Sequence, residues 1–415
     1  MINSIITLIK NVVRSTIKAP IKKMLTLLEN ACLASPIKSR FSAWYSNVVE
    51  KGVEKGVEEG VETDEDATGF KPTFEPLKWK SINKVEYSGV CVLSKGKLLM
   101  YRPLEVFQRH PDARKAIVST RNYRPLKYPG SQHSLSLALV RRNWAYWRKG
   151  KKTVSLTGSV ALLGNCEFDN ANYYHFWVDV IADIWFVRQH LAAEELPDYY
   201  LVPFANLAWQ WDILTLCGIH ESQVIPYAKH DVLSLDRLII PIRDKGALNL
   251  PSWLIRAMHD MCGWTPTPHK GKRLIFVSRA DADYRCVANE SVICNRLREK
   301  GFEVHTLKGL SITEQQQLFA TAAIICAPHG AALTNVAWCG PGTIIIDFLS
   351  EQHLVPCFSK LAAQNKLVYY PYICKRVEGT ASGLKGDIIV SDSQIDSVLD
   401  IVTHHLKLTG EVLES

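Results

Sequence analysis

The turn Pro328-His329-Gly330 combines residue types that suit phosphate binding. It follows a short apolar run and precedes two alanines, Ala331 and Ala332. Small side chains at the start of a helix let a ligand approach the free backbone N–H groups, whose partial positive charge favours an anion. His329 would add a hydrogen bond to phosphate or ribose. The alternative is a tight strand–helix turn in which His329 has a structural role.

Two arginines, Arg279 and Arg285, follow a second apolar run, and Asn289-Glu290 then begins a helix. The guanidinium fork binds diphosphate oxygens bidentately, so arginines at the exit of a strand suit that ligand. Together with His329 they predict a diphosphate site, although the sequence contains neither a P-loop nor a G-x-G-x-x-G fingerprint. The alternatives are surface salt bridges for the arginines and a helix cap for Asn289.

A third cluster, NYYHFWVD (172–179), carries a histidine and a carboxylate one helical turn apart. Asn172 suits the N-cap position, and His175 and Asp179 share a face of the helix that follows. A histidine oriented by a carboxylate can act as a general base, and the positive end of a helix favours its neutral form. Neighbouring aromatic rings suit the apolar faces of sugars, although an aromatic plug with a solvated His–Asp pair is the alternative. We therefore assign catalysis to His175 and Asp179, and acceptor binding to Tyr173, Tyr174, Trp177 and Asp183.

The elements that position these residues alternate between strands and helices from about residue 71 onward. Strands are predicted at 90–94, 159–164, 238–242, 273–279, 302–307, 324–327 and 343–348. Helices are predicted at 172–191, 291–301 and 313–322. Short apolar strands that alternate with helices indicate an α/β fold, with parallel sheets covered on both faces. Ligands of such sheets bind at the carboxyl ends of the strands, where Arg279 and His329 stand.

The first 70 residues have a different character. Residues 1–48 contain seven Lys or Arg side chains and one acid, and the apolar residues of 2–18 recur at helical spacing. A basic amphipathic helix of this kind lies on an anionic membrane surface, or packs on its own domain or on a partner. Residues 49–70 contain a repeated KGVE unit and an acidic run, which predicts a flexible acidic linker.

Composition narrows the class of protein. A chain of 415 residues with 47% hydrophobic and 22% charged residues is long enough for two or three globular domains. No stretch reaches the roughly 18 apolar residues of a membrane span. The eleven cysteines lack zinc-site spacing, and scattered reduced thiols indicate the cytoplasm. We predict no metal site and no nucleic-acid partner, and peripheral contact with the inner face of a membrane through residues 2–28 stays open.

Four segments occur in an order that points to one family: NYYHFWVD, SRADADYRCVANE, EQQQLF and APHGAALTN. Over about residues 155–375 the chain resembles glycosyltransferase family 61. This group includes plant xylan-decorating transferases, eukaryotic O-linked N-acetylglucosaminyltransferases and bacterial capsule-locus proteins. The resemblance implies a GT-B fold of two facing Rossmann-like domains, and inverting transfer from a nucleoside diphosphate-sugar without an obligatory metal. The implied donor-binding residues are Arg279, Arg285, Asn289, Glu290, His329, Gly330, Ala331 and Asn335.

The chain departs from the family pattern at two places. Members commonly have Pro-Arg after the first aspartate, where this sequence has Ala182-Asp183, so the acceptor is not predictable. Asp347 stands where a glutamate is usual, and its shorter side chain argues against a ribose contact there.

These observations predict five segments along the chain. They are basic amphipathic helices at 1–48, the linker at 49–70, an acceptor-side Rossmann-like domain at 71–265, a nucleotide-sugar-binding Rossmann-like domain at 266–380 and a helical tail at 381–415. The predicted enzyme is an inverting hexosyl- or pentosyltransferase that acts on a saccharide or other hydroxyl acceptor in surface polysaccharide or glycan synthesis. It needs no cofactor beyond its donor substrate. The alternatives are an inactive transferase-like scaffold at a membrane surface and a sugar-nucleotide-modifying enzyme, which would need a dinucleotide fingerprint.

Overall fold

The computed structural model describes residues 89–94, 97–101, 115–119, 153–164, 172–203, 206–226, 232–243, 250–381 and 383–409. All of these residues belong to one compact unit of the chain. The predicted N-terminal helices and the acidic linker lie outside the described residues. Among the described helices, none is both long enough and apolar enough to cross a membrane.

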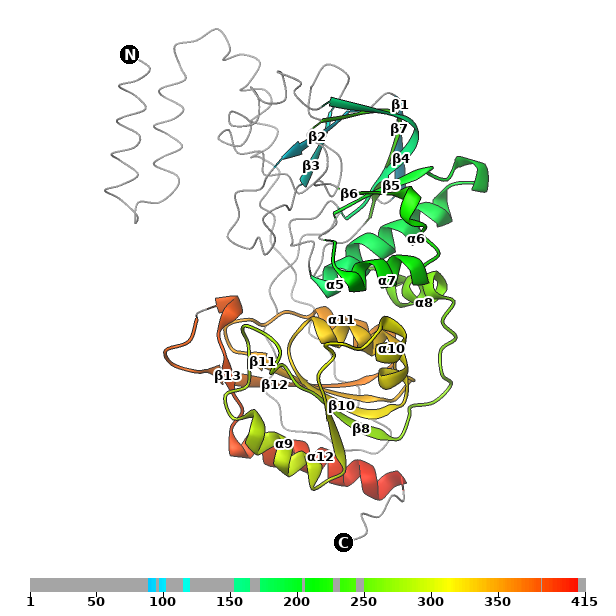
Figure 1. Cartoon of the computed structure of the whole chain (residues 1–415). Coiled ribbons are helices and arrows are strands. Elements are labelled where there is room, and N and C mark those ends of the chain that lie inside the picture. Colours follow the sequence, from blue (N-terminus) through cyan, green and yellow to red (C-terminus); the bar gives the residue numbers. More distant parts are fainter. Residues whose placement is uncertain are drawn as a thin grey trace, which may run out of the picture. The chain divides into compact units, whose positions relative to one another are not determined.

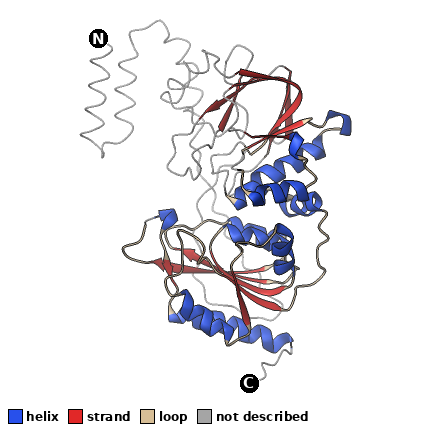
Figure 2. Cartoon of the chain, viewed as in Figure 1, coloured by secondary structure: helices blue, strands red, loops and turns tan. Residues whose placement is uncertain are grey.

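The first sheet contains the strands that precede residue 243, and Figure 2 draws the strands of both sheets in red. Its strand order is β3-β2-β7-β4-β5-β6, with β1 also paired to β7. Strands β4 to β7 run parallel to their neighbours in this group, whereas β1 and β2 run antiparallel to β7, and β3 antiparallel to β2. The strands are β1 (Gly89–Ser94), β2 (Lys97–Tyr101), β3 (Lys115–Ser119), β4 (Thr153–Leu162), β5 (Tyr199–Val202), β6 (Val224–Pro226) and β7 (Val232–Ile242).

One long helix of this first part carries the predicted base. It begins as α5 (Tyr173–His175), widens into a π-helix, η1 (Phe176–Ile181), and continues as α6 (Ala182–His190). The predicted helix at 172–191 is therefore confirmed, but its middle turn is not α-helical. Two further helices, α7 (Ala208–Leu216) and α8 (Leu254–Cys262), lie on the same side of the first sheet (Figure 1).

The second sheet has the order β13-β12-β11-β10-β8-β9, and only β13 runs antiparallel to its neighbour. Its strands are β8 (Arg273–Val277), β9 (Phe302–His305), β10 (Ala322–Pro328), β11 (Ile344–Ser350), β12 (Val368–Arg376) and β13 (Ile388–Ile389). The strand order reverses between β8 and β10. In open parallel sheets ligands bind at the carboxyl ends of the strands beside such a reversal.

Helices cover both faces of the second sheet, as a parallel sheet requires. Figure 1 shows α10 (Ile312–Ala320) and α11 (Cys357–Gln364) on one face, and α9 (Glu290–Arg298) and α12 (Asp392–Thr409) on the other. The segment after Gly330 forms a 3₁₀-helix, η5 (Ala331–Trp338), instead of the expected α-helix. The mixed α/β class predicted from the sequence is confirmed.

The C-terminal segment differs from the predicted separate tail at 381–415. Within it, β13 pairs with β12, and α12 buries Ile395, Val398 and Val402 against the second sheet. This helix therefore covers one face of the second sheet and is not a separate tail. The apolar periodicity of α12 was visible in the sequence, but its partner sheet was not.

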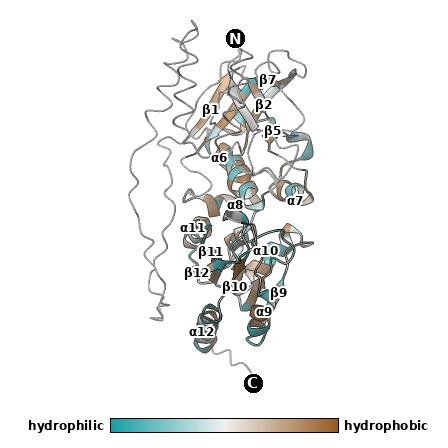
Figure 3. Cartoon of the chain, turned by 90° about the vertical axis from the view of Figure 1, so that its left-hand side faces the viewer, coloured by the Kyte–Doolittle hydropathy of each residue, from teal (hydrophilic) through white to brown (hydrophobic). Residues whose placement is uncertain are grey.

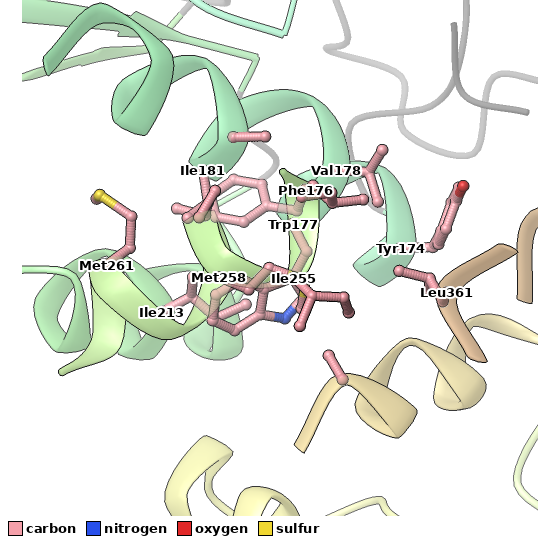
Figure 4. Packing of buried hydrophobic residues seen from close by; sticks show 14 of the residues in the cluster. Tyr174, Phe176, Trp177, Val178, Ile181, Ile213, Ile255, Met258, Met261 and Leu361 are labelled. Atoms are coloured by element: carbon pink, nitrogen blue, oxygen red, sulfur yellow. The ribbon is translucent and has the colours of Figure 1, made fainter. Parts of the chain in front are cut away.

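The central core of the described residues joins α5 to α8 with α10, α11 and η5. Figure 4 shows Trp177 of η1 beside Ile255 and Met258 of α8, and Tyr174 of α5 beside Leu361 of α11. Figure 3 shows that the helices carry hydrophilic residues as well as hydrophobic ones, whereas the strands of the second sheet are mainly hydrophobic. This core fixes the position of the helix that carries His175 relative to α11.

Candidate active site

The predicted contact between the general base His175 and Asp179 is formed in the structure. Asn172 caps α5, because its side chain accepts hydrogen bonds from the backbone N–H groups of Tyr174 and His175. The Nδ1 atom of His175 lies 2.9 Å from Oδ2 of Asp179, and their side chains are 13% and 4% exposed. When Nδ1–H donates to this carboxylate, Nε2 carries the lone pair that can accept a proton. The pair is largely buried, which contradicts the solvated alternative.

A buried arginine that the sequence reasoning missed holds this pair. Arg243, which follows β7, places Nη2 3.7 Å from Oδ1 of Asp179 and forms an ion pair through Nε with Asp183. Asp183 also accepts a hydrogen bond of 2.7 Å from the backbone N–H of Gly164, and it is 6% exposed. The acceptor-binding role predicted for Asp183 is therefore wrong for this structure, because the side chain is used inside the protein.

The predicted phosphate turn lies where β10 ends. Nδ1 of His329 is 2.8 Å from Oδ2 of Asp347 on β11, and the hydroxyl of Tyr369 on β12 donates to the same oxygen at 2.6 Å. The backbone N–H of His329 also donates to the carbonyl oxygen of Phe348 at 2.9 Å. Three adjacent strands thus fix the orientation of the His329 ring. Oδ1 of Asp347 is buried and has no hydrogen-bond partner among the described residues.

Gly330 lets Arg279 reach across this turn. A Cβ atom at Gly330 would lie 1.9 Å from Nη1 of Arg279, so only glycine leaves room for the guanidinium there. Nη2 of Arg279 donates to the carbonyl oxygen of Tyr284 at 3.0 Å, and the guanidinium lies 5.7 Å from the centre of the Tyr284 ring. The guanidinium of Arg285 lies 5.4 Å from the same ring. The structure therefore brings both predicted arginines together beside Tyr284, and Arg279 reaches the glycine of the phosphate turn.

Arg285 has an unusual backbone. Its φ angle of 54° places it in the left-handed region, which residues other than glycine rarely adopt. Such conformations concentrate at functional sites, where the surrounding structure holds them in place. Cys286, the next residue, is held by a hydrogen bond of 2.9 Å from its backbone N–H to Asp387.

Two predicted donor-binding residues beside the arginines have internal partners. Glu290 accepts hydrogen bonds from the hydroxyl of Ser278 and, at 3.5 Å, from the backbone N–H of Arg279, so it supports the exit of β8. Asn289 stands at the N-cap position of α9, but its amide donates to the carbonyl of Val390 and accepts from the N–H of Val390. The donor-contact assignment for Asn289 is corrected to a structural one, which ties α9 to the start of α12.

Asn335 is a further correction. Its side chain is fully buried, accepts from the Tyr173 hydroxyl at 2.8 Å and from Nε1 of Trp338 at 3.1 Å, and donates to Gln315 at 3.0 Å. A carboxamide used in this way is part of a polar network inside the core. The hydroxyl of Tyr173 therefore belongs to this network, and contact of its half-buried ring with an acceptor stays a prediction. Ala331 begins η5 directly after Gly330 and stays beside the phosphate turn.

The other two aromatic residues predicted to bind an acceptor are also in the core, since Tyr174 is 5% exposed and Trp177 is fully buried. Burial raises the pKa of Tyr174 well above its usual value. The Tyr174 ring lies 5.2 Å from the His175 ring and 5.5 Å from that of Phe358, which lies 4.8 Å from the His329 ring. Two aromatic rings therefore separate the predicted base from the predicted phosphate turn.

The acidic residues near the arginines do not gather into a metal site. Asp281 and Asp283 are exposed on the segment between β8 and α9. Among the described residues, no three His, Cys, Asp or Glu side chains converge as metal ligands. Cys286 lies in the same segment, where its thiol donates to the carbonyl oxygen of Ala282 at 3.2 Å, and burial raises its pKa. Burial also raises the pKa of Cys357, at the start of α11, to about 12. Both thiols are therefore neutral and poor nucleophiles.

The sequence reasoning missed Arg243, Tyr369 and Phe358. Arg243, like Arg279, follows an apolar strand. The same sequence pattern could therefore have identified it. Tyr369 and Phe358 carried no such signal, because their partners His329 and Asp347 lie on other strands and segments of the fold.

The comparison with protein families agrees with this geometry. The family model described as Glycosyltransferase 61 matches residues 173–346. The match begins at the helix that carries His175, includes Arg243, Arg279 and Arg285, and ends one residue before Asp347. No curated protein matches the chain.

Proposed function

Over residues 173–346 this chain belongs to glycosyltransferase family 61, and from that premise we propose an inverting transferase that uses a nucleoside diphosphate-sugar. The protein is a glycosyltransferase by its family, and such an enzyme has a donor and an acceptor. The donor class, the stereochemistry and the residue roles below are the proposal.

The diphosphate would bind at the carboxyl ends of β8 and β10. Three observations support this position: the strand order reverses there, Arg279 packs directly on Gly330, and Arg285 lies against the same tyrosine. Backbone N–H groups at the start of η5 and the arginine forks would meet the negative charge that develops on the leaving diphosphate. Donors fixed in advance at the place where charge develops lower a reaction barrier most effectively.

His175 would act as the general base. Its Nε2 atom would take the proton of the acceptor hydroxyl as the hydroxyl oxygen attacks the anomeric carbon. The bond from that carbon to the diphosphate oxygen breaks with its electron pair, and the configuration inverts in this single displacement. Asp179 would hold the ring and stabilise the imidazolium that forms.

The observation that carries the proposal is the line of packed rings that joins the two centres. The rings of His175, Tyr174, Phe358 and His329 pack one against the next, and Tyr174 meets Phe358 edge to face in one core. One packed core therefore holds the base and the leaving-group site in a fixed relation, and the sugar would lie beside this line of rings. We further propose that the two sheets form the two Rossmann-like halves of a GT-B enzyme.

The wider setting also belongs to the proposal. The acceptor would be a saccharide or other hydroxyl compound of a surface polysaccharide or glycan, and the sugar a hexose or pentose. No cofactor is assigned, because the arginines and the helix start can stabilise the charge of the leaving group. Residues 2–28 would attach the enzyme peripherally to the inner face of a membrane.

The test begins with thermal shift against a panel of nucleoside diphosphates and their sugars. The donor identified in this way is then used in transfer assays, in which NMR determines the anomeric configuration of the product. His175→Ala is expected to lower turnover by about 10²–10⁴ with donor affinity nearly unchanged, and Asp179→Asn to lower it less. Near-normal turnover in both variants, or a product with retained configuration, would refute the assigned mechanism.

A further inference from the structure

We propose that Arg243 is a positioning residue that fixes the His175–Asp179 pair in its catalytic geometry. The inference rests on the proposed function, because it assumes that His175 is the base. Arg243 does not touch the reacting atoms in this scheme. It acts on them through the backbone and the carboxylate of Asp179.

The contacts of Arg243 all lead to the helix that carries the base. Nη1 donates to the carbonyl oxygen of Val178 at 3.0 Å, and Nη2 donates to that of Asp179 at 3.3 Å. Nη2 is also 3.7 Å from the carboxylate of Asp179, while Nε pairs with Asp183. The three nitrogens of one guanidinium thus hold two carbonyl oxygens and two carboxylates.

These contacts fall on the π-helical turn. A π-helix is rare and usually marks a functional site, because its i→i+5 geometry is less favourable than the α-helical one. The backbone N–H of Ala182 bonds to the carbonyl of Trp177, five residues earlier, and Val178 and Asp179 point their carbonyls at Arg243. We infer that the arginine stabilises the wide turn, which in turn sets the direction of Asp179 toward His175.

Charge balance gives Arg243 a second effect. Asp179 and Asp183 are buried on the same helix, and Arg243 is the cation that pairs with both among the described residues. The Tyr174 ring lies beside His175, and burial raises the pKa of its hydroxyl well above the usual value, so it stays neutral. Removing the arginine would remove the positive charge that balances Asp183 and Asp179, the carboxylate bonded to His175, and this would favour the imidazolium, which cannot accept a proton.

The experiment uses three variants of the full chain, with the donor found by thermal shift and an acceptor that supports transfer by the wild-type enzyme. Arg243→Gln removes the charge and leaves the two carboxylates. The double variant Arg243→Gln/Asp183→Asn restores the net charge of the cluster, so it avoids an excess of buried carboxylate. Arg237→Gln is the matched control, because Arg237 lies on the same strand, β7, and its hydrogen bond of 3.0 Å and ion pair of 3.9 Å are both with Glu195 and not with the helix of His175.

We expect Arg243→Gln to lower kcat by about tenfold to hundredfold, less than the loss of the base itself, with an unchanged KM for the donor. The acid limb of its pH–rate profile should move to higher pH. The double variant should recover the wild-type pH profile and the thermal stability, but its kcat should stay low because the two carbonyl contacts are still missing. The control should behave as the wild type. NMR of the His175 ring should report a weakened hydrogen bond from Nδ1–H to Asp179 in both Arg243 variants, because the carboxylate is no longer held in one direction.

Two results would overturn the inference. One is a stably folded double variant with wild-type kcat, since Arg243 would then serve stability alone. The other is an Arg243→Gln enzyme with unchanged kcat and pH profile. Failure of the proposed function is distinguishable from both, because His175→Ala would then keep its turnover whatever Arg243 does.

Discussion

Replacing Gly330 by alanine tests the contact between the phosphate turn and Arg279. The new Cβ atom would lie 1.9 Å from Nη1, 3.0 Å from Cζ and 3.6 Å from Cδ of Arg279. Ordinary contact needs about 3.4 Å, so the guanidinium must withdraw by roughly 1.5 Å. The φ angle of Gly330 is −176°, an extended conformation that alanine adopts without strain. The substitution therefore displaces one side chain and costs little stability.

The expected loss is that of one charge-assisted hydrogen bond to the diphosphate. Such a bond contributes about 1.5–3 kcal/mol, so Kd for the nucleoside diphosphate should rise by roughly 10- to 150-fold. Isothermal titration gives Kd, and urea unfolding gives stability. Gly342→Ala is the matched control, because the φ angle there is 80° and a Cβ atom would meet no heavy atom within 4 Å. It should cost about 1 kcal/mol of stability and leave Kd unchanged.

A double-mutant cycle decides whether the effect passes through Arg279. In an Arg279→Ala background the new methyl group has no guanidinium to displace, so Gly330→Ala should then have almost no further effect on Kd. Additive effects of the two substitutions would show that the methyl group acts on the ligand directly. Wild-type affinity in Gly330→Ala itself would show that Arg279 does not bind the diphosphate.

Three further predictions concern the second sheet and the segments that pack on it. Arg285→Gly removes the guanidinium and relieves the left-handed backbone; the thermal shift given by uridine or cytidine diphosphate should disappear while unfolding stability is retained, and a persisting shift would place the diphosphate elsewhere. Tyr369→Phe removes one of the two donors to Asp347, so urea unfolding should show a loss of about 1–2 kcal/mol. Burial, with Lys270 and His404 nearby, lowers the pKa of His405 to about 4. The unfolded histidine titrates near 6.5, so the neutral ring contributes its full stability above that pH and loses it as pH falls toward 4, by up to about 3 kcal/mol. His405→Gln should flatten this dependence in unfolding curves between pH 7 and 4.5, and an unchanged slope would refute the assignment.

The strands of the second sheet were predictable because their sequences admit one interpretation. All residues of β10 and β11 are buried, and continuous apolar runs of this length between helices indicate central parallel strands. The exits of β8 and β10 then followed from topology, and with them the positions of Arg279 and His329. The prediction of the donor side needed only local patterns and one rule about parallel sheets.

The aromatic residues of NYYHFWVD could not be placed in this way. Their pattern fits a sugar-binding surface as well as a core, and the choice depends on what packs against the helix. In the structure the partners come from α8, α11 and η5, which lie 75 residues or more further along the chain. Asn289 was misassigned for the same reason, since its partner Val390 is 101 residues away. Tertiary contacts of this kind leave no trace in local spacing.

The π-helical turn shows why the contact of the base could be predicted from the sequence while the geometry of its helix could not. The spacing of His175 and Asp179 was sufficient to predict their contact, because residues four apart meet on any helix of this kind. The width of the turn depends on Arg243, whose strand ends more than 60 residues later, and the sequence gives no local reason for it. A residue pair can thus be found from its spacing, whereas the group that holds the pair in one orientation has to be found in the fold. The Arg243→Gln variant can measure that distinction. It retains both His175 and Asp179, yet its pH–rate profile should differ from that of the wild type.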